Sequence, residues 1–163
     1  MGKVVKMLYN DIQHPGYCQI RWNARDYKNE SVPAGLYFYT VESGNNVIVT
    51  GDWNTAHHSI DLARPKENTK TSGFMPIERK KLDLYVENGW TDTFRLFHSE
   101  GERYSWWTYR FGARDRNVGW RIDYFFVNNN MVPMCLDADI HSNVLGSDHC
   151  PVSLILDINN NDF

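Results

Sequence analysis

The run NNVIVTGDWN, residues 45–54, constrains the fold more strongly than any other part of the chain. Its centre, VIVT, is apolar and rich in β-branched residues, which favours a buried strand. An acid and an amide, Asp52 and Asn54, follow this strand at once. Two interpretations stay open, because Gly-Asp and Asn are common turn residues and polar side chains at a strand end are also well placed for chemistry.

The remaining periodicity predicts a sheet covered by helices, of the α/β or α+β class. A helix is expected over residues 76–89, where a proline stands at the start and Gly89 at the end. Residues 19–29 could form a second helix, which Pro33 and Gly35 would end. The segment 55–74 is polar and predicts a loop, and the terminal NNNDF should fray. Further strands are expected at residues 4–9, 104–109, 122–127, 137–142 and 152–158.

Composition places the chain among ordinary globular proteins. Its 163 residues suffice for one domain with a core, and the net charge of −3 excludes a surface coated in positive charge. The three cysteines, Cys18, Cys135 and Cys150, are an odd number without metal-type spacing, which indicates a reducing compartment. No apolar run is long enough to span a membrane and no signal peptide is visible, so we expect a cytoplasmic protein with no membrane partner.

Asp52 and Asn54 form the first group of candidate site residues. Alternate positions of an extended segment point the same way, so both side chains could reach one point. A carboxylate and an amide oxygen together suit a hard metal ion or the orientation of a water molecule.

Asp123 is the second candidate, because it interrupts the apolar strand of GWRIDYFFV. A carboxylate there is unfavourable unless it is paired. One interpretation is a structural ion pair with Arg121 or another cation, and the other is a site residue.

The third candidate group is Asp148 and His149 in LGSDHCP, between Gly146 and Pro151. Histidine can gain or lose a proton near neutral pH. A lone histidine is usually structural, whereas one beside an acid in a loop shaped by Gly and Pro is a better site candidate. His149 would need an orienting carboxylate, and Asp123 is available for that role.

The segment RYSWWTYRFGARDRNVGWR, residues 103–121, forms a local basic and aromatic region. Arginine suits phosphates, and aromatic faces suit an unstacked base or a sugar. The alternative is that the aromatic residues are core and the arginines a solvated loop. We expect some of each, with Tyr104 and Trp106 buried and with Tyr109 and Trp120 facing a ligand.

These motifs occur together in one family. In VIVTGDWN, GDWNTAHHSIDLARPK, SGFMPIERKKLD, GWTDTFR, YSWWTYRFGARDRNVGWRIDYFFV and LGSDHCPVSL, the chain resembles the exonuclease III class of apurinic/apyrimidinic (AP) endonucleases, within the endonuclease/exonuclease/phosphatase superfamily. The motifs span residues 46–157, inside what we take as a single truncated domain over residues 1–163. The resemblance implies the second half of a four-layered α/β sandwich and a DNA-repair nuclease that cleaves double-stranded DNA at abasic sites.

The resemblance also implies roles for the candidate residues. Asp52 would position the attacking water, Asn54 would bind the phosphate or a metal, and His149, oriented by Asp123, would stabilise the phosphoryl oxygen. Asp148, with Asp52 and Asn54, would hold Mg²⁺, with Mn²⁺ as an alternative. The predicted contacts to DNA and to the abasic sugar are Tyr109, Arg110, Phe111, Arg114, Arg116, Asn117 and Trp120.

The chain departs from the family in its first 45 residues. No counterpart of the family's N-terminal half or of its metal-binding Glu is found there. We therefore expect a homodimer or a complementary N-terminal half to cover the open sheet, and a weak nuclease or none from the chain alone. The alternative functions are a catalytically incomplete half-domain that only binds DNA or a partner chain, and a phosphatase of the same superfamily.

Overall fold

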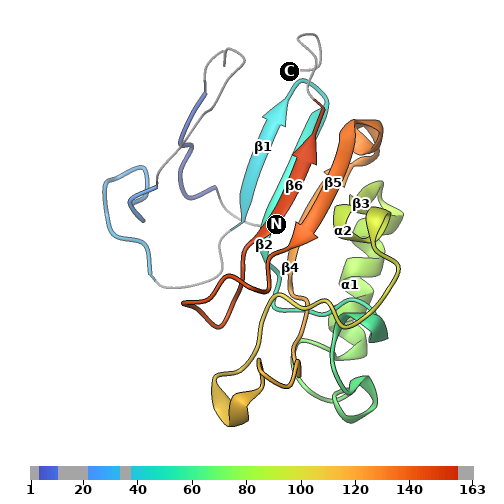
Figure 1. Cartoon of the computed structure of the whole chain (residues 1–163). Helices are drawn as coiled ribbons and strands as arrows, with labels where there is room; N and C mark the ends of the chain where they lie inside the picture. The colour runs from blue at the N-terminus through green and yellow to red at the C-terminus, as the bar shows by residue number, and fades with distance from the viewer. Residues whose placement is uncertain (1–3, 11–21, 34–37, 158–163) are drawn as a thin grey trace. The chain divides into compact units, whose positions relative to one another are not determined.

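The structure is a computed structural model that describes residues 4–10, 22–33 and 38–157. It divides the chain into two units, Met1–Gly35 and Leu36–Phe163, which are described separately below. All α-helices and strands of the described residues lie in the second unit, in the order β1 (Tyr39–Ser43), β2 (Asn46–Asp52), α1 (Pro76–Glu87), β3 (Trp90–Asp92), α2 (Thr93–Phe97), β4 (Asp123–Asn128), β5 (Cys135–Ile140) and β6 (Val152–Leu156) (Figure 1). Short 3₁₀ turns lie at Ser59–Asp61, Pro65–Glu67, Arg110–Gly112 and Asn129–Met134. Within the described ranges, every helix is too short or too polar to cross a membrane.

The first unit differs from both sequence predictions. Residues 4–9 are not in a strand, and the described part of the expected helix, residues 22–29, forms a turn. The Asp26 carboxylate accepts hydrogen bonds from the backbone N–H groups of Lys28 and Glu30, at 2.8 and 3.0 Å. This local bonding competes with helix formation, which explains why the helical pattern fails. Residues 19–21, Ala34 and Gly35 lie outside the described residues.

A four-stranded antiparallel sheet in the order β1-β2-β4-β3 forms the centre of the second unit. The predictions of β2 and β4 are confirmed, whereas β1 and β3 were not expected. The prediction of a strand over residues 104–109 is wrong, because Trp106 forms only isolated bridges to Trp120 and His149. The aromatic side chains of this segment are divided between two buried clusters. Tyr104 and Trp107 pack with Phe94, whereas Trp106 packs against the cluster that contains Phe74.

Helix α1 covers one face of this sheet and confirms the helix prediction. Leu82 of α1 is buried against Tyr124 and Phe126 of β4, with Tyr85 packed beside them. The helix ends before Gly89, whose φ of +88° is one that glycine adopts without strain. Since side chains alternate along a strand, Asp123 lies on the face of β4 opposite Tyr124 and Phe126.

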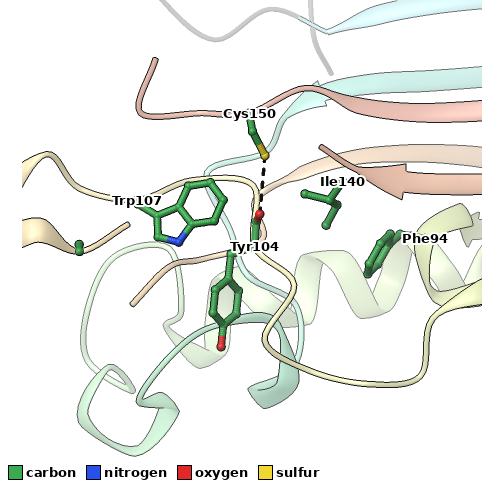
Figure 2. Close-up of a cluster of buried hydrophobic side chains, with 6 residues drawn as sticks. Phe94, Tyr104, Trp107, Ile140 and Cys150 are labelled. Atoms are coloured by element: carbon green, nitrogen blue, oxygen red, sulfur yellow. Dashed lines mark hydrogen bonds between the residues drawn. The ribbon is translucent and has the colours of Figure 1, made fainter. Parts of the chain in front are cut away.

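The two-stranded antiparallel sheet of β5 and β6 also confirms its strand predictions. It lies beside β4, which contacts β6 (Figure 1). The cluster in Figure 2 joins it to the rest of the unit, because Phe94 of α2, Ile140 of β5 and Cys150 pack with Tyr104 and Trp107. Ile158, expected on the buried face of β6, and the terminal NNNDF lie outside the described residues.

Candidate active site

Asp52 and Asp123 face each other across two neighbouring strands. Asp52 is the last residue of β2 and Asp123 the first of β4, and the two are direct partners in the antiparallel register. Directly opposed residues of an antiparallel pair extend from the same face of the sheet. Burial raises the pKa of Asp52 above its ordinary value, and the negative charges of Asp123 and Asp148 raise it further. The two central strands therefore bring two carboxylates together at one end of the sheet.

The His149 ring binds one of these carboxylates. Its Nδ1 lies 2.9 Å from Oδ2 of Asp123, and both side chains are half-buried. The hydrogen bond to Asp123 raises the pKa of His149, and the negative charges of Asp52 and Asp148 act in the same direction. Asp123 therefore pairs with His149 and not with Arg121, whose partners are Asp61 and Asp92.

Asp148 is held beside this pair by two tryptophans. The indole N–H of Trp106 donates to one carboxylate oxygen at 3.1 Å, and the hydroxyl of Ser147 donates to the other at 3.2 Å. The backbone carbonyl of Asp148 accepts from the N–H of Trp107 at 2.9 Å. Burial opposes ionisation of Asp148, but the bond from Trp106 and the charge of His149 outweigh it and lower the pKa of Asp148. Asp148 is therefore a charged carboxylate at the rim of the site.

Asn54 reaches the site by a different geometry from the one predicted. β2 ends at Asp52, and Asn54 has a left-handed backbone with φ of +49° and an exposed side chain. Its backbone N–H donates to Oδ1 of Asp52 at 2.8 Å. The expectation of alternating side chains on an extended segment is wrong here, because the Asp52 carboxylate closes a turn with the backbone two residues on. The turn interpretation of Asp52 is therefore confirmed, and its role as a site residue stays a prediction.

The carboxylates of Asp52 and Asp148 are of the kind that binds a hard divalent cation, but they form an incomplete set of ligands. The mutual repulsion that raises the pKa of Asp52 is the kind of interaction that a bound cation relieves. Mg²⁺ is commonly anchored by one or two carboxylates and keeps several waters, and Asp52 and Asp148 could supply those carboxylates. Within residues 4–10, 22–33 and 38–157, no group of three or more His, Cys, Asp or Glu side chains could hold a metal ion.

The aromatic and basic segment separates into exposed and inward-facing residues. Tyr109 and Phe111 are 77% and 86% exposed, and Arg110 and Arg116 are exposed beside them. Phe111 has a left-handed φ of +59°, and its carbonyl accepts from Nη2 of Arg116 at 2.8 Å. These four residues stand at the surface, where a large ligand can contact them.

Trp120 is only partly buried and packs on the cluster of Ala56, Leu62, Phe74 and Ile122. Its ring lies against the backbone of Gly73, where an added Cβ would approach a ring carbon to 3.1 Å. The expectation for Tyr104 is confirmed, since it is buried, while Trp106 is half-buried. Trp106 and Trp120 are therefore both partly accessible, and the indole of Trp106 lies against Asp148.

Two further residues predicted to contact DNA make hydrogen bonds inside the protein. Asn117 accepts from the indole N–H of Trp107 at 3.2 Å and donates to the carbonyl of Glu102 at 2.9 Å. Arg114 donates to three backbone carbonyls of residues 142–147. A cavity of about 400 Å³ lies between residues 107–115 and residues 145–148, and its lining includes Trp107, Tyr109, Leu145 and Asp148.

Sequence reasoning missed Ser105 and the partners of Arg121. The fully buried Ser105 hydroxyl accepts from the backbone N–H groups of Ile122 and Asp123, at 3.1 and 3.2 Å, and so fixes the start of β4. Arg121 is fully buried between Asp61 and Asp92. An arginine next to an apolar strand was a usable signal for buried acids elsewhere, whereas nothing in the sequence marked Ser105.

The sequence of the chain is similar to those of a known protein family and of several characterised nucleases. The profile of the Endonuclease/Exonuclease/phosphatase family matches residues 14–149. The chain is 46% identical over 135 residues to the exodeoxyribonuclease of Bacillus subtilis (strain 168), covering 82% of this chain and 54% of that protein. It is 41% identical over 133 residues to the DNA repair nuclease APEX1 of Danio rerio, covering 80% of this chain and 43% of that one.

Solved structures agree with the sequence comparisons. An AP endonuclease from Archaeoglobus fulgidus superposes with a TM-score of 0.63 at 28% identity, covering 68% of this chain and 45% of that one. A 3′-5′ exonuclease from Neisseria meningitidis gives a TM-score of 0.66 at 29% identity, covering 70% and 46%. The chain thus spans about half the length of the relatives it matches. The predicted resemblance and fold class are confirmed.

Proposed function

Because the chain belongs to the endonuclease/exonuclease/phosphatase family, we propose that it supplies the phosphodiester-cleaving centre of a DNA-repair nuclease that acts at abasic sites. The observation that carries the proposal is the pairing of His149 with Asp123 beside Asp52, at the ends of β2 and β4. Several relatives support the substrate class, since they are named as exodeoxyribonucleases, AP endonucleases and a DNA repair nuclease.

In this proposal, Asp52 aligns the water that attacks the phosphorus and accepts its proton. A carboxylate whose pKa is raised is a better proton acceptor than an ordinary one, and the N–H of Asn54 fixes its orientation. The Asn54 side chain, exposed next to it, would contact the phosphate or the metal.

His149 would stabilise the charge that develops on the phosphoryl oxygen. With Nδ1 bonded to Asp123, Nε2 is the ring nitrogen that can donate to that oxygen. The raised pKa of His149 favours the protonated imidazole, in which the Nε2 donor carries a positive charge. Asp123 thus acts through His149, as a positioning residue.

We propose that Mg²⁺, or Mn²⁺ in its place, is held by Asp148 and Asp52. When bound, the ion would supply positive charge to the phosphate and lower the pKa of a bound water. The two carboxylates are too few to form a complete protein cage, so waters and the substrate phosphate would complete the coordination.

The proposed substrate is double-stranded DNA that carries an abasic site. Arg110 and Arg116 are exposed next to the cavity and would contact backbone phosphates. Trp120, with Tyr109 and Phe111, would contact the base-free sugar and its neighbours. An abasic nucleotide has lost its stacking, so its displacement from the helix costs little free energy.

The proposal also includes a partner for the open sheet. Tyr39 and Val41 of β1, Leu136 of β5 and Ile155 of β6 are exposed apolar residues. Apolar residues on exposed strands are typical of surfaces that another segment covers. We expect that segment to be a complementary N-terminal half of the same fold, and a second copy of the chain is the outcome to be tested against it.

The proposal is tested with a duplex that contains one abasic site and an end label. The chain is incubated with Mg²⁺, alone and together with the N-terminal half of a relative, and the cleaved strand is measured. The expected result is cleavage 5′ to the abasic site that requires the added half and is lost in His149→Asn. His141→Asn is the matched control, because His141 binds the hydroxyl of Ser153 and not a carboxylate. Abasic DNA bound without cleavage in every combination would instead support the half-domain that only binds.

A further inference from the structure

The guanidinium of Arg114 is bonded to the loop that leads to Asp148 and His149. Its Nη1 donates to the carbonyl of Ser147 at 2.8 Å. Its Nη2 donates to the carbonyls of Ser142 and Val144, at 2.9 and 2.7 Å. One side chain from the basic segment therefore binds three carbonyls along residues 142–147.

The rest of this guanidinium is also occupied. Nε is buried, and no nitrogen or oxygen of the described residues accepts its hydrogen. The guanidinium carbon lies 4.6 Å from the ring centroid of Trp107, in a cation–π contact. Arginine has five N–H groups, of which three are bonded to carbonyls and the fourth is buried. At most one N–H remains for a DNA phosphate, so Arg114 cannot offer the two-pronged contact for which arginine is suited.

The loop that Arg114 binds has few other supports. Residues 142–147 are exposed, and Gly146 has a φ of +117°. Segments with exposed backbone and few buried contacts open locally at low free-energy cost. Beyond this loop the chain becomes firmly held, because Trp107 binds the backbone of Asp148 and Cys150 lies in the cluster of Figure 2. Arg114 therefore binds the segment that precedes Asp148 and His149, whereas Trp107 and the buried cluster support the chain from Asp148 onward.

We propose that Arg114 is a positioning residue for Asp148 and His149, and that it does not bind the DNA backbone. The inference rests on the proposed function, in which these two residues contact the metal and the phosphate. The guanidinium of Arg114 packs on the ring of Trp107, and its planar set of N–H groups donates to the loop carbonyls. Its neighbour Arg116 has a different environment, because it is exposed and its hydrogen bonds to the described residues are to carbonyls of its own turn, Phe111 and Gly112.

This difference makes Arg116 the matched control for Arg114. Four proteins are compared, namely the wild type, Arg114→Ala, Arg114→Lys and Arg116→Ala. The first measurement is amide hydrogen exchange over residues 142–149 and, as a reference, over α1. The second is the affinity for an abasic duplex without metal at several salt concentrations. The third is the rate of cleavage with Mg²⁺ and the complementary half, resolved into kcat and KM.

We expect Arg114→Ala to speed exchange over residues 142–149 while α1 exchanges as in the wild type. The salt dependence of DNA affinity should stay unchanged, and kcat should fall about a hundredfold with little change in KM, since a displacement of about 1 Å can have that effect. Arg114→Lys should show most of the same loss, because an ammonium cannot replace the fork. Arg116→Ala should leave exchange over residues 142–149 unchanged, weaken the binding of DNA and lower the slope of log affinity against log salt by about 1.

The opposite pattern would overturn the inference. Wild-type exchange over residues 142–149 in Arg114→Ala, with a reduced salt slope, would show that Arg114 contacts phosphate directly. Full activity in Arg114→Lys would show that only its charge matters. If the wild type neither binds nor cleaves DNA, the proposed function fails, while the exchange measurement still decides whether Arg114 holds the loop.

Discussion

Replacement of Arg121 by methionine should strongly destabilise the second unit. Arg121 is fully buried, and its Nε lies 2.8 Å from Oδ1 of Asp61. Its two terminal nitrogens bind the Asp92 carboxylate at 3.1 and 2.6 Å. Loss of one partner from a buried charge group costs about 3–5 kcal/mol, because the remaining charges are left uncompensated. Total stabilities of about 5–15 kcal/mol are usual, so the variant should lose a large share of its stability.

The pKa of Asp61 gives a second estimate. Burial alone would raise this pKa, but the charge and hydrogen bonds of Arg121 and Arg95 outweigh it and lower the pKa from 3.8 to about 2. Because the folded-state pKa is depressed, this contribution is present above about pH 4 and is lost as the pH falls through about 2. The shift corresponds to about 2 kcal/mol, of which Arg95 retains a part in the variant. The pKa of Asp61 thus accounts for at most about 2 kcal/mol of the expected loss, and the rest of the roughly 3–5 kcal/mol comes from the Asp92 side of the pair.

Urea unfolding at neutral pH, followed by tryptophan fluorescence, measures this loss. Arg121→Met should shift the midpoint strongly to lower urea, and Asp92→Asn added to it should restore part of the stability by removing a buried charge. Arg116→Met is the control, because Arg116 is exposed, and it should change stability by less than about 0.5 kcal/mol. A loss below about 1 kcal/mol in Arg121→Met would refute the reasoning, since it would mean that the buried acids need no counter-charge.

Three further predictions concern the site. Asp123→Asn should lower the pKa of His149 toward its ordinary value and reduce cleavage by about a hundredfold or more, and a histidine titration by NMR with a rate assay checks both. An unchanged titration would remove Asp123 from its role. Cleavage should rise as the pH rises through the raised pKa of Asp52 and fall as it passes the raised pKa of His149, so a pH–rate profile without two limbs would contradict the assigned proton states. Trp120→Ala should reduce the preference for abasic over intact duplex in competition binding, and an equal preference in both proteins would argue against its contact with the sugar.

The parts of the fold that the sequence predicted are those with strong local patterns. β2, β4, β5, β6 and α1 each combine an apolar repeat with turn or end signals, and all were confirmed. β1 and β3 are short edge strands, whose pairing depends on β2 and β4 and not on their own composition. The aromatic run at residues 104–109 has high strand propensity, but its bridges to Trp120 and His149 place it across several segments. Tertiary contacts thus overrode propensity there.

The candidate site could be predicted further than its supports. The sequence shows residue types that suit catalysis at Asp52, Asp123, Asp148 and His149. The structure brings these side chains together at one end of the sheet, where β2 ends and β4 begins. Whether an arginine faces the solvent or the protein cannot be seen in a sequence. Arg114 and Arg116 are two residues apart in one basic segment, yet one binds a loop and the other is exposed.

The central claim is that His149, held by Asp123, serves phosphodiester cleavage at abasic sites. The most direct test compares cleavage by the wild type and Asp123→Asn of a duplex with one abasic site, in Mg²⁺ and with the complementary half supplied. The account predicts cleavage on the 5′ side of the site in the wild type, reduced about a hundredfold or more in Asp123→Asn while DNA affinity stays the same. Equal cleavage by both proteins, or cleavage of intact duplex at the same rate as abasic duplex, would contradict it.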